Sequence, residues 1–218
     1  ASETISPSGS RSSSGVWPRA ATARGRAIAT TIEGMLERLE AVAALDPVLP
    51  WFPVDDLDLP AGALADATVT VPDVTQPIRP TNRLTELGTA ASVVRLYAVG
   101  VTPDATALHR DRVRDAGQSF ELVTTPDGVD AARGTPPVRD PLADLLETEA
   151  VVVVADPDPA LPFFGRFDGT SVIGVTSDAG SIAGVVEWTD DRIVDWVDDR
   201  FDELLAAADE LTREDLTR

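Results

Sequence analysis

The chain has 218 residues and contains no Lys: its 18 basic residues are all Arg, set against 37 Asp and Glu, and the net charge is −19. Carboxylates keep a folded surface hydrated in concentrated salt, so this balance is typical of salt-accumulating halophiles, and we expect a haloarchaeal source. The absence of Cys excludes disulfides and thiolate chemistry, and a single His, His109, excludes a multi-His metal site. No run of 18 apolar residues and no signal peptide occurs, which predicts a cytoplasmic protein with no membrane partner.

The N-terminal part divides into two predicted segments. Residues 1–16 are Ser-rich and low in complexity, and we expect a disordered tail. Residues 17–48 are expected to form a linker or dimerisation helix, because apolar residues recur every three or four positions between Ala23 and Leu45. This face either packs on the chain's own domain or pairs with another helix.

The Pro-rich connector at residues 50–60 is expected to hold that helix away from the rest of the chain. An isolated helix of this length is marginal in water, so its apolar face needs a partner. We therefore predict a homodimer whose interface includes Ile32, Met35, Leu36 and Leu39.

Residues 49–218 are predicted to form an α/β domain, a mixed β-sheet sandwich with flanking helices. A β-prone run at residues 64–75 comes first, and strands are then expected at 92–99, 118–125 and 150–155. Helices are expected from Pro103 to about Ala116 and at residues 140–147. Three hairpin strands follow at 163–168, 171–176 and 182–188. A last helix, capped by Thr189, is expected to run from Asp190 to about Leu211.

Few residues point to chemistry. Neither glycine-rich phosphate-binding pattern occurs, and one of the two needs a Lys. Arg95 and Tyr97 are two residues apart on a predicted strand and so share one face, where they could bind an anionic ligand. His109, on the following helix, is a further candidate. The alternatives are a solvent-facing Arg and Tyr, or an Arg paired with an acid, and a half-exposed helical His. No cofactor and no metal site is expected.

Residues 49–59 (LPWFPVDDLDL) and 64–72 (LADATVTVP) resemble a stretch of haloarchaeal helix-turn-helix transcriptional regulators. In these proteins an N-terminal winged helix precedes an effector domain of the methanogenesis-regulator middle-domain type. Residues 22–26 (TARGR) resemble the junction between wing and linker helix, and the resemblance extends loosely over residues 17–212. It implies a phospholipase-D-like sensor domain, with the winged helix absent from this chain. The phospholipase pattern needs His-x-Lys, which is missing, so that activity is not implied.

The resemblance and the residues together predict a non-catalytic effector-sensing and dimerisation domain of a transcription regulator. Its expected partners are a second copy and a small-molecule or protein effector, with DNA reached only through the absent winged helix. Two alternatives remain open. One is a stand-alone module that heterodimerises with full-length regulators, and the other is a divergent α/β hydrolytic enzyme.

Overall fold

The computed structural model describes residues 22–53, 57, 59, 61–157, 161–177 and 181–217. The predicted tail at residues 1–16 lies outside this part of the chain. An eight-stranded mixed sheet forms the centre of the fold, in the spatial order β1-β7-β6-β5-β2-β3-β4-β8. The strands are β1 (Thr68–Thr70), β2 (Val93–Ala98), β3 (Ser119–Thr124), β4 (Val151–Val154), β5 (Phe163–Phe167), β6 (Thr170–Thr176), β7 (Ile182–Trp188) and β8 (Asp209–Glu210).

The middle of the sheet is parallel and its flanks are antiparallel. Strands β2, β3 and β4 run in one direction and are joined by helical crossovers, whereas β5, β6 and β7 follow one another as hairpins. The first crossover helix, α3 (Pro103–Ala116), begins where Thr102 accepts a hydrogen bond from the backbone of Ala105 and ends at Gly117, whose φ is +65°. Only Gly adopts that backbone freely, so this helix has the boundaries that its sequence predicts.

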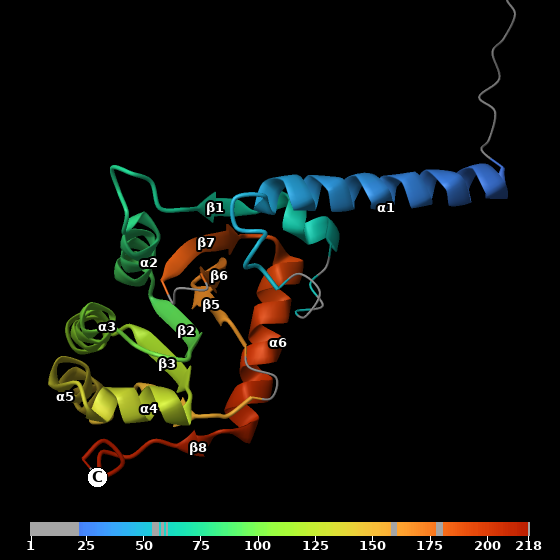
Figure 1. Cartoon of the computed structure of the whole chain (residues 1–218). Coiled ribbons are helices and arrows are strands. Elements are labelled where there is room, and N and C mark those ends of the chain that lie inside the picture. The colour runs from blue at the N-terminus through green and yellow to red at the C-terminus, as the bar shows by residue number, and fades with distance from the viewer. Residues whose placement is uncertain are drawn as a thin grey trace, which may run out of the picture.

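Helices cover both faces of the sheet (Figure 1). One face carries α2 (Arg79–Ala90), α3, α4 (Pro126–Arg133) and α5 (Pro136–Leu145), which bury the side chains of one strand parity, such as Leu96 and Leu122. The other carries α6 (Asp191–Ala207) and the short 3-10 helix η1 (Ala61–Asp66), which bury the opposite parity, such as Tyr97 and Val123. The predicted α/β fold with a mixed sheet and flanking helices is confirmed.

Several element predictions are wrong in detail. The β-prone run at residues 64–75 supplies only the three residues of β1, because η1 occupies residues 61–66. Helices α2 and α4 were not predicted at all, and α5 lies earlier than expected. The last helix ends at Ala207 and not at about Leu211. The chain then forms the edge strand β8, and Leu211 after it is buried on the other face of the sheet, with α4 and α5. Asp190, not Thr189, caps α6 through the backbone of Arg192.

Helix α1 (Ala23–Leu45) spans the stretch of apolar spacing within the predicted segment 17–48, and it is capped by Thr22, whose hydroxyl accepts a hydrogen bond from the backbone of Gly25. Figure 1 shows it projecting from the sandwich. Its C-terminal end is nevertheless anchored, because Leu45, Val48 and Phe52 are buried in the core on the α6 face. The connector therefore fastens the end of the helix to the sheet, contrary to the expectation that it holds the helix away.

The joint between α1 and the sheet is closely packed. A Cβ added to Gly184 of β7 would lie 2.5 Å from the Cγ1 atom of Val48, so only Gly leaves room for this side chain. Among the described helices, none is both long and apolar enough to cross a membrane.

Candidate functional site

A row of exposed apolar side chains lies on α1. We call it the α1 seam, and it consists of the side chains that share one helical face beyond the anchored end: Ile28, Ile32, Met35, Leu36, Leu39 and Val42. Each keeps 47% to 61% of its surface exposed. Scattered apolar residues are normal on a protein surface, whereas a contiguous row of six is typical of a surface that contacts a partner. All four residues predicted for a dimer interface belong to this row.

Arg95 of β2 lies on the face covered by α6, and three carboxylates surround its guanidinium. Its Nε donates to Glu121 at 2.6 Å, one terminal nitrogen donates to Asp198 at 3.0 Å, and the other pairs with Asp202. The guanidinium carbon also lies 4.4 Å from the ring centroid of Phe201, a cation–π geometry.

These contacts set the charge state of the Arg95 cluster. Burial lowers the pKa of Arg95, but hydrogen bonds to Asp202, Glu121 and Asp198 outweigh burial and raise it above its usual range. Arg166, directly opposite Arg95 on β5, pairs with Asp198 as well. The guanidinium groups of Arg95 and Arg166 therefore fasten α6 to the sheet. The structure thus shows the alternative given above, an Arg95 that is paired with acids.

Tyr97 shares the face of Arg95, as its spacing predicted, and it is completely buried. Its ring stacks on Phe164 with the centroids 5.4 Å apart. Burial raises the pKa of the phenol, as does the charge of Asp156, while a hydrogen bond from the Leu161 backbone opposes them. Tyr97 is thus a core residue whose hydroxyl interacts with the backbone of Leu161.

His109 lies on the opposite face of the sheet from Arg95 and Tyr97 and is buried rather than half-exposed. Its ring stacks on Phe120 at 4.4 Å, and its Nδ1 lies 2.9 Å from the side-chain oxygen of Gln118. The Gln118 nitrogen donates to the carbonyls of Gly88 and Ala91, so its oxygen accepts from His109, and the ring is the Nδ1–H tautomer. Burial lowers the pKa of His109, and the bond to Gln118 opposes this effect.

The three predicted ligand-binding residues do not meet in one pocket. The sheet separates His109 from the other two, and each has partners within the chain. Two shallow hollows of about 350 and 370 Å³ in the described surface contain none of the three. The first lies between α4 and β8, and the second lies beside Gly117 and Thr148. A ligand-binding role for Arg95, Tyr97 and His109 stays a prediction.

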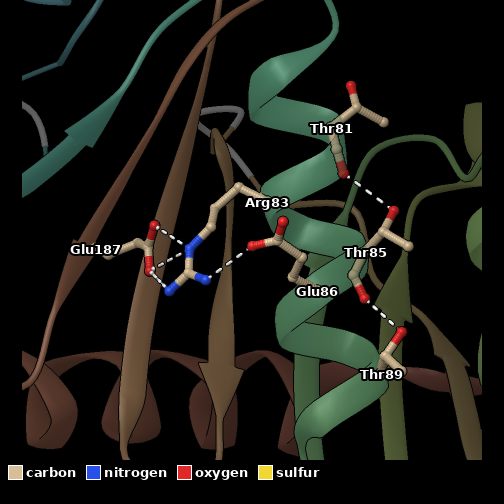
Figure 2. Close-up of polar contacts among 6 residues, drawn as sticks. All are labelled: Thr81, Arg83, Thr85, Glu86, Thr89 and Glu187. Carbon is tan, nitrogen blue, oxygen red and sulfur yellow. Dashed lines mark hydrogen bonds and ion pairs between the residues drawn. The ribbon is translucent and has the colours of Figure 1, made fainter.

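A polar contact that the sequence did not reveal joins α2 to the sheet. Figure 2 shows Arg83 with its Nε and one terminal nitrogen on the carboxylate of Glu187, at 2.8 to 3.1 Å, and with its other nitrogen on Glu86. The Glu187 side chain is only 6% exposed. The bond to Glu187 raises the pKa of Arg83 most, although burial opposes it. The hydroxyls of Thr85 and Thr89 in the same view donate to backbone carbonyls one turn earlier. The Arg83–Glu187 contact therefore joins α2 to β7, whereas the Thr hydroxyls bond within the helix.

The family described as "Methanogenesis regulatory protein FilR1, middle domain" matches residues 77–207, from just before α2 to the end of α6. A comparison with curated proteins found no match.

Two solved structures resemble this one. TrmBL2, described as an archaeal chromatin protein with a novel mode of DNA binding, is 13% identical with a TM-score of 0.52. The match covers 85% of this chain and 66% of that chain, so this chain spans just under two thirds of its length. A phospholipase D family member, Nuc from Salmonella typhimurium, is 13% identical with a TM-score of 0.54, and the match covers 67% of this chain and 99% of that one.

At such identities the two structures show a shared fold alone, which is the phospholipase-D-like sandwich that the sequence suggested. The family match is stronger, since it takes in more than half of the chain and nearly all of the sandwich. This chain therefore belongs to the family of the middle domain of methanogenesis regulatory proteins, a domain associated with transcription regulators.

Proposed function

We propose that this chain is the effector-sensing and dimerisation part of a transcription regulator and that it carries out no catalysis. Its membership of a regulator family supports the first half of this proposal. The observation that carries the dimerisation role is the α1 seam, an exposed apolar row on a helix that projects from the sandwich.

The seam fits a second copy of the chain. Six large side chains that are about half exposed would remove roughly 500 Å² per chain from water, or about 1,000 Å² for a pair, which reaches the lower limit of specific interfaces. Two-fold pairing is also the commonest assembly of soluble proteins. The chain would then exist as a symmetric dimer joined through α1.

Signal transfer is proposed to run between the sandwich and α1. Val48 sits against Gly184 of β7, and Leu45 shares the same core, so the end of the helix is packed on the sheet at the strand next to its β1 edge. Packed elements have few alternative arrangements. An effector that changes the packing of the α6 face would therefore change the direction of α1.

The sandwich itself is an unsuitable surface for DNA. Its last helix and the residues after it carry many more acids than Arg, and the whole chain has a net charge of −19. We propose that DNA is contacted by a winged helix joined to α1, as in the regulators that the sequence resembles, and not by this domain.

The absence of catalysis is supported by the state of the polar residues. Arg95 is paired with acids, Tyr97 is enclosed in the core, and His109 is bonded to Gln118 on the other face. An acid–base or nucleophilic site needs such groups close together around a cleft.

The test is the oligomeric state. We expect the wild type to be a dimer in light scattering at tens of micromolar protein in about 2 M KCl, and Leu36→Asp to be a monomer, because a buried carboxylate without a partner is costly. Thr30→Asp is the matched control, since it adds the same charge on the opposite side of the same helix and should stay a dimer. Circular dichroism checks that both variants keep the sandwich. A monomeric wild type, or a Leu36→Asp dimer, would contradict the proposal.

A further inference from the structure

If two copies pair through α1, the direction of pairing decides which sandwich lies beside which end of the helix. We propose that the two helices run antiparallel, so that the beginning of each α1 lies against the sandwich of the other copy. This inference rests on the proposed dimer and adds its geometry, which the dimer alone leaves undetermined.

The spacing of the α1 seam supports a two-helix contact. Five of its members, at positions 28, 32, 35, 39 and 42, alternate intervals of four and three, which is the a/d pattern of a coiled coil. Positions 32 and 39 are then a, and positions 28, 35 and 42 are d. The β-branched Ile28 and Val42 occupy d, while Leu39 occupies a. Position a also holds the β-branched Ile32, but no Leu occupies d, so the seam lacks the full pattern of β-branched residues at a and Leu at d that favours parallel dimers.

The antiparallel register follows from the seam itself. In one antiparallel register Ile28 faces Leu39 of the second copy and Ile32 faces its Met35, so the two-fold axis passes near the middle of the seam. The large side chains at a and d from position 28 to position 39 then each face an apolar side chain of the second helix. Gly25 then faces Val42, and the small residue leaves room for the chain crossing there. A register shifted by one heptad in one direction would place Ile28 against Asp46, and the opposite shift would place Leu39 and Val42 beyond the start of the second helix at Ala23.

The flanking positions fit the same register. Position e lies beside the a/d row, and it is occupied by Leu36 and, one heptad earlier, by Ala29. Both residues are exposed. In an antiparallel pair e positions face e positions, so Leu36 packs against Ala29 of the second copy, a large side chain against a small one. A parallel pair would instead place Leu36 against the hydroxyl-bearing Thr31.

The charges along α1 favour the same direction. Arg24 and Arg26 lie in its first turns, whereas Glu33, Glu37 and Glu40 with Arg38 lie in its second half. An antiparallel pair brings the basic end of each helix toward the acidic half of the other, but Glu33 and Glu40 lie at position b and Glu37 at f, outside the a/d seam, so this attraction acts over a longer distance than an ion pair. Salt at about 1 M screens such charges over roughly 3 Å, so they select the direction mainly at lower salt.

The register has a consequence for regulation. Thr22 of one copy lies level with Leu45 of the other, and Leu45 is where α1 enters the core of its own sandwich. The start of each helix is therefore next to the joint of Val48 and Gly184 in the second copy. An effector bound by one sandwich would act on the N-terminal end of the other chain's helix.

The chain has no Cys, so single-Cys variants give a clean test. Ile28→Cys and Leu39→Cys are mixed, one of them with a size tag, left to exchange subunits, and oxidised mildly. We expect a disulfide between the two variants and none in Ile28→Cys alone. In the antiparallel pair the two Ile28 positions are offset by 11 residues, or about 16 Å along the axis, beyond the roughly 7 Å limit between the Cα atoms of a disulfide.

A second measurement leaves the seam intact. A nitroxide on Ala23→Cys should show the two labels about 30 Å apart in the antiparallel pair, because they are offset by 21 residues, whereas a parallel pair places them at one level. Disulfide formation by Ile28→Cys alone, or a short distance between the labels, overturns the direction and leaves the dimer standing. A monomeric wild type in light scattering overturns both. A wild-type dimer whose variants form neither disulfide and whose labels lie much farther apart than 30 Å overturns α1 as the interface.

Discussion

Replacing Arg95 by Met separates two roles for the best ligand-binding candidate of the sequence. If Arg95 exists to fasten α6 to the sheet, its loss leaves Glu121 and Asp198, whose side chains are 27% and 26% exposed, with too little positive charge nearby. If instead it is kept for an anionic ligand, the ligand-free protein gains by losing it, because a desolvated guanidinium is replaced by an apolar side chain of similar length.

The structure supports a loss of stability. Breaking a fully buried ion pair costs about 3–5 kcal/mol, but the carboxylates here are partly exposed and Asp198 keeps Arg166, so we expect about 2 kcal/mol for Arg95→Met. For a chain of this length that lowers the Tm by roughly 4–8 °C.

The assay is thermal unfolding in about 2 M KCl, without added ligand. Arg200→Met is the matched control, since Arg200 lies on α6 but pairs with the exposed Glu203, and its loss should cost at most about 1 kcal/mol. Adding Glu121→Gln to Arg95→Met should restore part of the lost stability, because one unpaired carboxylate is removed. An Arg95→Met variant as stable as the wild type would refute the fastening role and return Arg95 to the ligand site.

Three further outcomes follow from the charges and their surroundings. The Tm of the wild type should rise strongly from roughly 0.1 M to about 2 M KCl, because salt screens the repulsion of a net charge of −19, and a flat curve would remove the halophile argument. Burial lowers the pKa of His109 below its value in the unfolded chain. The neutral ring therefore contributes its full stabilisation of the fold above about pH 6.5, and this contribution is lost as the pH falls from there toward the folded pKa. Urea unfolding should show the loss in the wild type and not in His109→Gln. Arg83→Met should cost about 3 kcal/mol in urea unfolding, because it leaves the enclosed carboxylate of Glu187 without its partner, and a cost no larger than that of Arg200→Met would contradict this account.

The elements that the sequence predicted are those with strong local signals. The continuous Val run of β4, the Thr102 cap and Gly117 stop of α3, and the three- and four-residue spacing of α1 each act within one element. Such signals do not depend on what packs against the element, so one sequence is enough to find them.

The missed helices are held by contacts distant in sequence. Helix α2 has few apolar residues and contains several Thr, and its position depends on the bond of Arg83 to Glu187 and on the close approach of Gly88 to His109. Helix α4 begins at Pro126, and its Pro and Gly resemble a loop, whereas α5 was predicted but placed too late, because it begins with Pro136 and Pro137. A Pro in the first turn is a start signal, and both helices carry it.

The site predictions divide in the same way. The shared face of Arg95 and Tyr97 follows from strand periodicity, which is local and was predicted. That α6 would cover this face and bring Asp198 and Asp202 to the guanidinium depends on the tertiary fold. His109 was misjudged as half-exposed because only the packing of α2 and the partner Gln118 make it a buried residue.

The distribution of paired and exposed side chains supports the proposal that this chain acts through α1. In the described sandwich each candidate polar residue has partners among other residues of the chain, and the strand faces are covered by helices on both sides. Within the described part of the chain the α1 seam stays about half exposed, although its large apolar side chains are of the kind that fill the core of the sandwich. Because Leu45 at the end of α1 is buried in the same core as Val48, which packs against Gly184 of β7, the same helix joins the exposed surface to the sheet. A regulator needs this connection more than it needs a cleft, since its output is the position of a helix.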